Sequence, residues 1–282
     1  MAIERFSMKN SRTKAALRRW KKRIALYRAT RLEGDEKAWE RIAEWYPDWT
    51  RYNDYVEVVL PRLRGAVEPT SRILEVGPGS GAFTVPLARV AREIVAVEPS
   101  AAMRTVLMRN LAEAGITNVH IIPQKIEEAV EGLYGPFDLT LASYALYNVE
   151  AVDQVISRLL RLSEHVVALM GTGEPREWYR DLAWRLRGQE VVSPPQLNYF
   201  YPLLLEMGIY ADVDVFWTTC NYVYDSEEAL MEWWRRHFHL TESDRPALRE
   251  ALLPLVEWKD GRIGIYRRSR AALVWIERRR HA

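Results

Sequence analysis

The stretch Ile73-Leu-Glu-Val-Gly-Pro-Gly-Ser-Gly-Ala-Phe83 decides the fold. An apolar run leads directly into glycines at 77, 79 and 81, and a helical pattern follows. Glycine has no Cβ, so the backbone at these positions can approach a ligand closely. The stretch therefore predicts a strand, a glycine loop and a helix, with a ligand at the carboxyl end of the strand.

The first of five short apolar runs lies in this stretch, and the other four follow it. They lie at residues 72–76, 93–98, 119–122, 137–142 and 165–170, and helical patterns of about 10–15 residues separate them. Near-continuous apolar runs of this length are typical of parallel strands that are covered on both faces. The spacing predicts an α/β protein with a doubly wound sheet.

Composition excludes several classes of protein. With 48% hydrophobic and 28% charged residues in mixed order, the chain of 282 residues is neither disordered, collagen-like nor a coiled coil. No apolar run approaches the roughly 18 residues that span a bilayer, and the N-terminus lacks the apolar core of a secretory signal. The single cysteine, Cys220, excludes an internal disulfide framework. We therefore expect a cytoplasmic protein without a membrane span.

Positive charge is concentrated at the N-terminus. Residues 1–31 hold eleven lysines and arginines against one acid, whereas the rest of the chain carries a net charge of −8. Leu17, Trp20, Ile24 and Tyr27 recur at helical spacing among these basic residues. The pattern predicts a basic amphipathic helix, which either binds an anionic partner such as nucleic acid or docks onto its own domain.

An acid precedes the glycine loop, and a second acid follows about twenty residues later. Glu75 stands two residues before Gly77, and the next strand ends in Glu98, whose carboxylate can accept two hydrogen bonds from a ribose diol. In this arrangement, residues 70–172 resemble the class I S-adenosylmethionine-dependent methyltransferases. The resemblance implies a mostly parallel seven-stranded, Rossmann-like sheet with a helical N-terminal arm and helical lid insertions. It also implies S-adenosylmethionine as methyl donor, S-adenosylhomocysteine as product and an in-line transfer driven by proximity and orientation.

The same resemblance implies the donor contacts. They are Glu75, Gly77, Pro78, Gly79, Gly81, Phe83, Glu98, Pro99, Met103, Gln124, Lys125, Ile126, Ser143 and Tyr144. Met103 is expected to pack against adenine. Relatives usually carry an acid for the adenine amino group after the third strand, where this chain has Gln124 and Lys125; only Gln124 can accept a hydrogen bond.

A dinucleotide site is the alternative to a methyl donor site. Gly77, Gly79 and Ala82 also satisfy the relaxed spacing of a nicotinamide-binding loop. Glu75 and Gly81 favour the methyl donor, because the acid has its place in the methyltransferase pattern and Gly81 breaks the dinucleotide spacing.

Motif positions and breaks divide the chain into five segments. We predict a basic helical arm at 1–35, capping helices at 36–70, a donor-binding core at 71–173, substrate-side helices with a sixth strand at 174–262, and a final strand with a basic tail at 263–282. Seven tryptophans lie in the last two segments, at positions 178, 184, 217, 233, 234, 258 and 275, where they form either core or an apolar pocket.

The acceptor side offers no compulsory catalytic group. Candidates that could face the reactive methyl are Tyr144, Tyr147 and His237. We predict no metal site, because His237 and His239 point to different faces of a helix and further ligands are not identifiable. We expect a small-molecule acceptor. The alternatives are a methyltransferase for RNA or protein that the arm anchors, and a binding protein that holds the donor without transfer.

Overall fold

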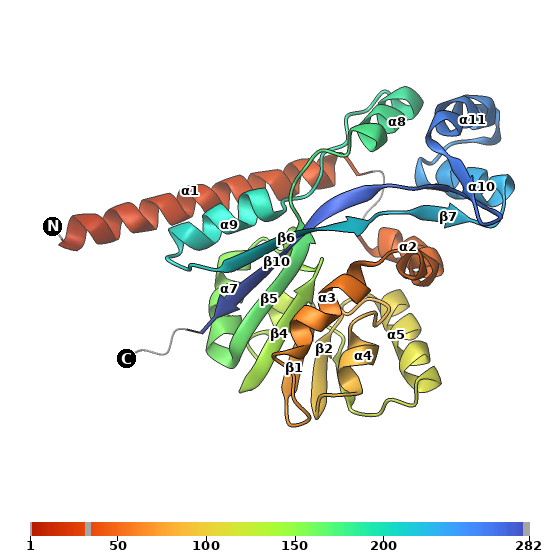
Figure 1. The fold of residues 1–282 in the computed structure, drawn as a ribbon. Helices are drawn as coiled ribbons and strands as arrows, with labels where there is room; N and C mark the ends of the chain where they lie inside the picture. The colour runs from red at the N-terminus through yellow and green to blue at the C-terminus, as the bar shows by residue number, and fades with distance from the viewer. Residues whose placement is uncertain (1, 32–34, 279–282) are drawn as a thin grey trace.

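A mixed sheet forms the centre of the computed structural model, which describes residues 2–31 and 35–278 (Figure 1). The sheet has seven strands in the order β3-β2-β1-β4-β5-β10-β6. Strands β1 to β5 are parallel, and β10 is antiparallel to both β5 and β6. The strands are β1 Arg72–Val76, β2 Glu93–Val97, β3 Val119–Ile122, β4 Phe137–Ser143, β5 Ser163–Gly171, β6 Asp212–Thr219 and β10 Arg268–Glu277. The predicted doubly wound, mostly parallel seven-stranded sheet is confirmed.

Helices cover both faces of this sheet because its strands are apolar on both sides. In β2, Val95 and Val97 belong to one core and Ile94 and Ala96 to the other. The first core also contains residues of α1 Ala2–Ala29, α6 Ile126–Ala129, α7 Val152–Leu162 and α9 Leu197–Glu206. The second contains residues of α3 Tyr55–Arg64 and α4 Thr84–Ala88, while α5 Ala101–Glu113 packs against α2 Asp35–Arg51.

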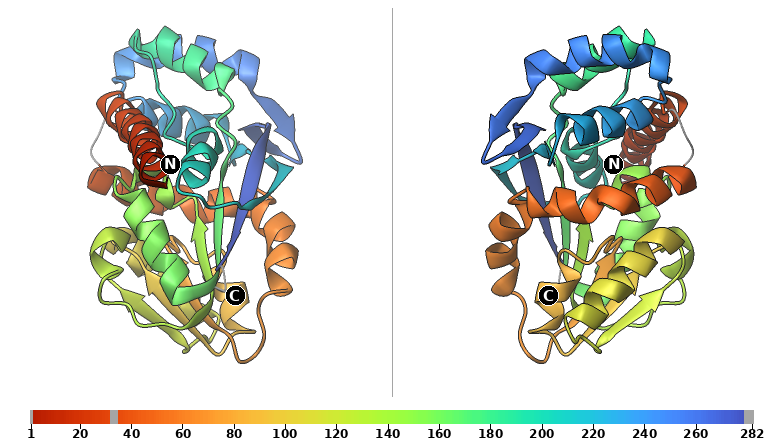
Figure 2. Two further views of the ribbon diagram at one scale, coloured as in Figure 1. Left: turned by 90° about the vertical axis from the view of Figure 1, so that its left-hand side faces the viewer. Right: turned by 90° about the vertical axis from the view of Figure 1, so that its right-hand side faces the viewer.

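The basic arm is docked onto its own domain. Trp20 and Ile24 on α1 are buried in the first core, and Trp20 Nε1 donates a hydrogen bond of 2.7 Å to the carbonyl of Val149. In Figures 1 and 2, α1 runs alongside α9. Its other face carries the exposed residues Lys14, Arg18, Arg19, Lys21 and Lys22. Residues 1 and 32–34 of the predicted arm lie outside the described residues.

The substrate-side segment contains more than helices. It holds α8 Glu177–Arg187, α10 Glu227–His237 and α11 Arg245–Leu252, together with a second sheet of order β7-β9-β8. That sheet consists of β7 Tyr222–Tyr224, β8 Glu257–Lys259 and β9 Arg262–Ile265. Ser226 caps α10, and Thr241 forms a capping box with Asp244 at the 3-10 turn that precedes α11.

One predicted segment boundary falls inside a strand. Within the segment 36–70, α2 continues through Pro47 to Arg51, and residues 52–54 separate it from α3. The boundary at 262/263 cuts through β9, which pairs with β7 and not with the final strand. Gly264 permits this close pairing, because a Cβ there would lie 2.7 Å from the carbonyl oxygen of Tyr222. The tail residues 279–282 lie outside the described residues.

None of the helices that the structure describes combines the length and the apolar character that crossing a membrane requires.

Candidate functional site

The glycine loop forms a cradle at the carboxyl end of β1. Gly77 and Gly79 have φ angles of +64° and +58°, a region that glycine enters at little cost. The N–H of Gly77 donates a 2.9 Å hydrogen bond to the carbonyl of Val97, which ties the loop to the end of β2. A Cβ on Gly77 would lie 2.8 Å from the Cβ of Ala145, so a side chain there would fill the cradle.

Glu98 lies at the neighbouring strand end and is held by backbone donors. Its carboxylate accepts hydrogen bonds from the N–H of Gly79 at 3.1 Å and from the N–H of Ser100 at 2.9 Å. Burial raises the pKa of Glu98, and these two donors together with Arg104 oppose the rise. The backbone of the glycine loop therefore fixes the position of this carboxylate.

Glu75 is buried beneath the loop. Burial raises its pKa to about 7, with a smaller contribution from the charge of Glu98. Neither Glu75 Oε2 nor the Thr84 hydroxyl has a hydrogen-bond partner among the residues described. A buried carboxylate oxygen without a donor is costly, so this position is suited to a ligand that brings a positive charge or a donor.

These residues line a cavity of about 730 Å³, which we call the first cavity. Most predicted donor contacts face it: Glu75, Gly77, Pro78, Gly79, Phe83, Glu98, Pro99, Lys125, Ile126, Ser143 and Tyr144. Arg28 of α1, Trp39 and Trp49 of α2 and Tyr55 of α3 line it as well. The sequence predicted these helices as caps, but no motif identified the residues that they direct into the cavity.

Three predicted contacts lie elsewhere. Met103 is buried beneath α2, where it packs with Ala43 and Val106 and not in the cavity lining. Gly81 (φ +88°) lies against α5, since a Cβ there would meet Leu107 Cδ1 at 2.6 Å. Gln124 is exposed beyond the end of β3. The prediction placed these residues by family position, and the packing of α2 and α5 determines where they lie.

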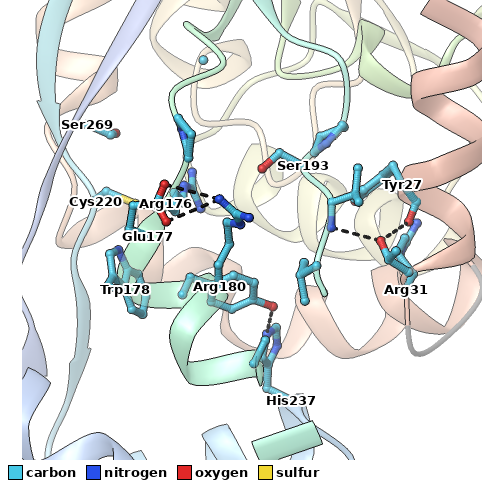
Figure 3. Close-up of a pocket in the computed structure, with 18 of the residues that line it drawn as sticks. Tyr27, Arg31, Arg176, Glu177, Trp178, Arg180, Ser193, Cys220, His237 and Ser269 are labelled. Atoms are coloured by element: carbon cyan, nitrogen blue, oxygen red, sulfur yellow. Dashed lines mark hydrogen bonds and ion pairs between the residues drawn. The ribbon is translucent and has the colours of Figure 1, made fainter. Parts of the chain in front are cut away.

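A second cavity of about 640 Å³ adjoins the first (Figure 3). It lies between the end of α1, the loop after β5, α8 and α10. Tyr144, Tyr147, Arg176, Cys220 and Ser269 line both cavities. Tyr144 follows β4 with a positive φ of 49°, and its N–H donates a 2.8 Å hydrogen bond to the carbonyl of Leu169. These shared residues form what we call the junction.

Aromatic rings form much of the wall of the second cavity. Its lining includes Trp45, Trp178, Tyr179, Tyr222, Trp233 and Trp234. The rings contact one another, with centroids 5.0 Å apart for Trp45 and Trp233 and 6.0 Å apart for Trp178 and Trp234. Of the seven tryptophans noted in the sequence, Trp184, Trp217 and Trp258 are exposed, and Trp275 is part of the main sheet.

His237 lies in this aromatic wall. Tyr179 Oη is 2.7 Å from His237 Nε2, and Arg41 Nη1 is 3.4 Å from His237 Nδ1. Because arginine only donates, Nδ1 acts as the acceptor and the ring proton resides on Nε2, which donates to Tyr179. Burial, with smaller contributions from Arg41 and His239, lowers the pKa of His237 to about 3. Among the described residues, no group of three His, Cys, Asp or Glu could hold a metal ion.

Comparisons with known proteins find similarity to methyltransferases. Residues 73–165 match the family described as a methyltransferase domain. The ribosomal RNA small subunit methyltransferase A of Desulforapulum autotrophicum is 40% identical over 63 residues, which is 22% of this chain and 22% of that protein. A tRNA/tmRNA (uracil-C(5))-methyltransferase of Nitratiruptor is 25% identical over 177 residues, or 57% of this chain and 49% of that protein.

Solved structures share the fold. A Bacillus halodurans protein described as a methyltransferase superposes with a TM-score of 0.55 at 13% identity, covering 80% of this chain and 100% of its own. The chain spans only about a fifth of the first curated relative that it matches. The likeness to the curated relatives therefore concerns part of each protein, and the likeness to the solved structure concerns the fold.

Proposed function

We propose that the chain is a class I S-adenosylmethionine-dependent methyltransferase and that it methylates a small organic molecule bound in the second cavity. The observation that carries the proposal is the junction, where Tyr144, Tyr147 and Arg176 face both cavities. Both volumes fall within the range of about 300–1,000 Å³ that is usual for small-molecule sites.

The first cavity has the properties that the methyl donor requires. S-adenosylmethionine, when bound, supplies a methyl group that its sulfonium already activates. The Oε2 of Glu75, which has no hydrogen-bond partner among the described residues, is suited to the positively charged amino-acid end, and Gly77 brings loop backbone to the cavity lining without a side chain. The Glu98 carboxylate, held by two N–H groups, retains lone pairs for a ribose diol.

The chain's own residues then orient the acceptor and exclude water. Tyr144 and Tyr147 are candidates to align the acceptor, because both line the junction. The ring of Tyr147 also contacts the ring of Tyr27 of α1 edge-on, with ring centroids 6.1 Å apart. Arg28 hydrogen-bonds Asn148 at 2.9 Å and pairs with Glu150, which holds α1 against the 3-10 turn Leu146–Asn148 that carries Tyr147. His237 has both ring nitrogens engaged, so we assign it to positioning Tyr179.

Two measurements test this proposal. S-adenosylmethionine and S-adenosylhomocysteine at 100 times their Kd should each raise the free energy of unfolding by about 2.7 kcal/mol, whereas NAD should not. Stabilisation by NAD alone would favour the dinucleotide alternative. Incubation with methyl-labelled donor and a low-molecular-mass cell extract should then yield a labelled product. Donor binding without any labelled product would favour the non-catalytic alternative.

An RNA acceptor is the second candidate, because the outer face of α1 is basic. Lys14, Arg18, Lys21 and Lys22 are exposed on that face. Deleting residues 1–31 would test this alternative poorly, because the deletion would also remove Trp20 from the core. The sharper test replaces the four basic residues by glutamine. Under the RNA alternative, the variant binds RNA more weakly. The slope of log K against log salt concentration also becomes less steep, by roughly 0.7–0.9 for each phosphate contact that is lost. Unchanged RNA affinity would leave the small-molecule proposal standing.

A further inference from the structure

The second cavity contains a cation that no carboxylate neutralises. Arg180 pairs with Glu177 at 3.3 Å, and Arg270 pairs with Glu174. The carbonyl of Arg176 accepts hydrogen bonds from α8, but its guanidinium makes no hydrogen bond or ion pair with any residue that the structure describes, and Figure 3 shows it beside Cys220.

Arg176 is exposed at the surface of the cavity. Nearby groups, first Cys220 and then Tyr222, Tyr144 and Tyr179, raise its pKa. A thiol and three phenols supply no formal negative charge at neutral pH. Because Arg176 lines both cavities, its five N–H donors are available to an anion at the junction.

The same cavity offers little to remove a proton from an acceptor. Its carboxylates Glu174 and Glu177 are paired with arginines, and the ring nitrogens of His237 are occupied by Arg41 and Tyr179. His239, the other imidazole of the lining, is exposed. An acceptor that is already ionised would need no such base, whereas a phenol or alcohol would.

The aromatic wall indicates the rest of the acceptor. Trp178, Trp233 and Trp234 bring large flat apolar surfaces into the cavity. Rings of this kind favour an aromatic or otherwise apolar body.

On the basis of the proposed function, we propose that the acceptor is a carboxylic acid with an aromatic or apolar body, which Arg176 binds through its carboxylate at the junction. One carboxylate oxygen takes the methyl group. The bond from sulfur to the methyl carbon breaks as the bond from oxygen to that carbon forms, so that a sulfonium and a carboxylate become a thioether and a methyl ester. No proton is released and no base is needed.

A carboxylate at Arg176 could also be the donor's own, so the binding test separates the two sources. The protein saturated with S-adenosylhomocysteine is titrated with 2-naphthoate and with its neutral analogue 2-naphthamide, and tryptophan fluorescence reports binding. Wild-type protein should prefer the acid by about tenfold or more, since a hydrogen-bonded charge is lost in the amide. Arg176→Gln should abolish this preference and leave the affinity for S-adenosylhomocysteine unchanged.

Arg268→Gln is the matched control, because Arg268 lines the same cavity but its guanidinium lies over the ring of Trp217 at 5.4 Å. It should retain the preference. Equal binding of acid and amide by wild-type protein would overturn the inference. Weakened S-adenosylhomocysteine binding by Arg176→Gln, with the preference intact, would assign Arg176 to the donor and overturn it as well.

The chemistry of the product gives an independent test. Label transferred from the methyl donor to an extract component should be released as methanol by mild alkali, as expected for a methyl ester. A product whose label resists alkali would refute the carboxylate acceptor while leaving the methyltransferase proposal intact. Failure of S-adenosylmethionine to bind or to yield any product would instead count against the proposed function.

Discussion

Replacing Glu75 by glutamine should stabilise the protein and weaken donor binding. Burial raises the pKa of Glu75 from an ordinary 4.5 to about 7, and each pH unit corresponds to about 1.4 kcal/mol. The folded chain thus binds this proton more tightly than the unfolded chain does. The stability that this bound proton contributes is fully present below pH 4.5. It is lost as the pH rises through about 7, which lowers the free energy of unfolding by about 3 kcal/mol. Glu75→Gln keeps the shape and removes the charge.

Urea unfolding at pH 5 and pH 8 measures this effect. At pH 8 we expect Glu75→Gln to have a free energy of unfolding about 3 kcal/mol above that of wild-type protein, and at pH 5 a much smaller difference. Glu113→Gln is the control, because its exposed carboxylate lies 4.0 Å from Arg109 at the helix surface and should change stability by less than about 0.5 kcal/mol. The affinity for S-adenosylhomocysteine, measured by calorimetry, should fall for Glu75→Gln alone. A variant less stable than wild-type protein at pH 8 would refute the reasoning, because it would mean that the ionised carboxylate has a favourable partner.

Three further substitutions test the site and the arm. Gly77→Ala should lower the affinity for S-adenosylhomocysteine at least about tenfold, as measured by calorimetry. Gly115→Ala is the control, because Gly115 has a similar φ of +67° but open space where a Cβ would lie. This control should lower the free energy of unfolding by only about 1–2 kcal/mol and keep the affinity. His237→Gln should lower turnover without changing the shape of the pH–rate profile between pH 6 and 8, because a pKa of about 3 keeps the imidazole neutral in that range. If the wild-type profile rises near pH 6.5 and the variant loses that rise, His237 acts as a base. Trp20→Ala should lower the free energy of unfolding by about 3–5 kcal/mol in urea titrations, and Lys21→Ala by less than about 0.5 kcal/mol; equal effects would mean that the arm is not docked in solution.

The sequence predicted the parts of the molecule that local patterns determine. Strands β1, β2, β4 and β5 are short, largely buried apolar runs, and the edge strand β3 is a short apolar run that is partly buried, so length and composition suffice to find them. The glycine loop and Glu98 form one edge because parallel strands end on the same side of a sheet. Predicting these features needed no knowledge of tertiary packing.

Other features depend on contacts between distant segments. Met103 lies under α2 because Trp39, Ile42 and Ala43 cover that part of α5, and no spacing in the sequence encodes this pairing. The sheet formed by β7, β8 and β9 was missed because its strands have only three or four residues. Arg176 shows no motif, and only the structure places it where the two cavities meet.

Two consecutive residues of α1 face different cavities. Tyr27 lines the second cavity and Arg28 the first, so the last turn of one docked helix is a common wall. A molecule that fixes this turn from one side also orders it for a molecule on the other side. Binding in the two cavities should therefore show positive cooperativity, and thermodynamic reciprocity requires that each ligand strengthens the other by the same factor.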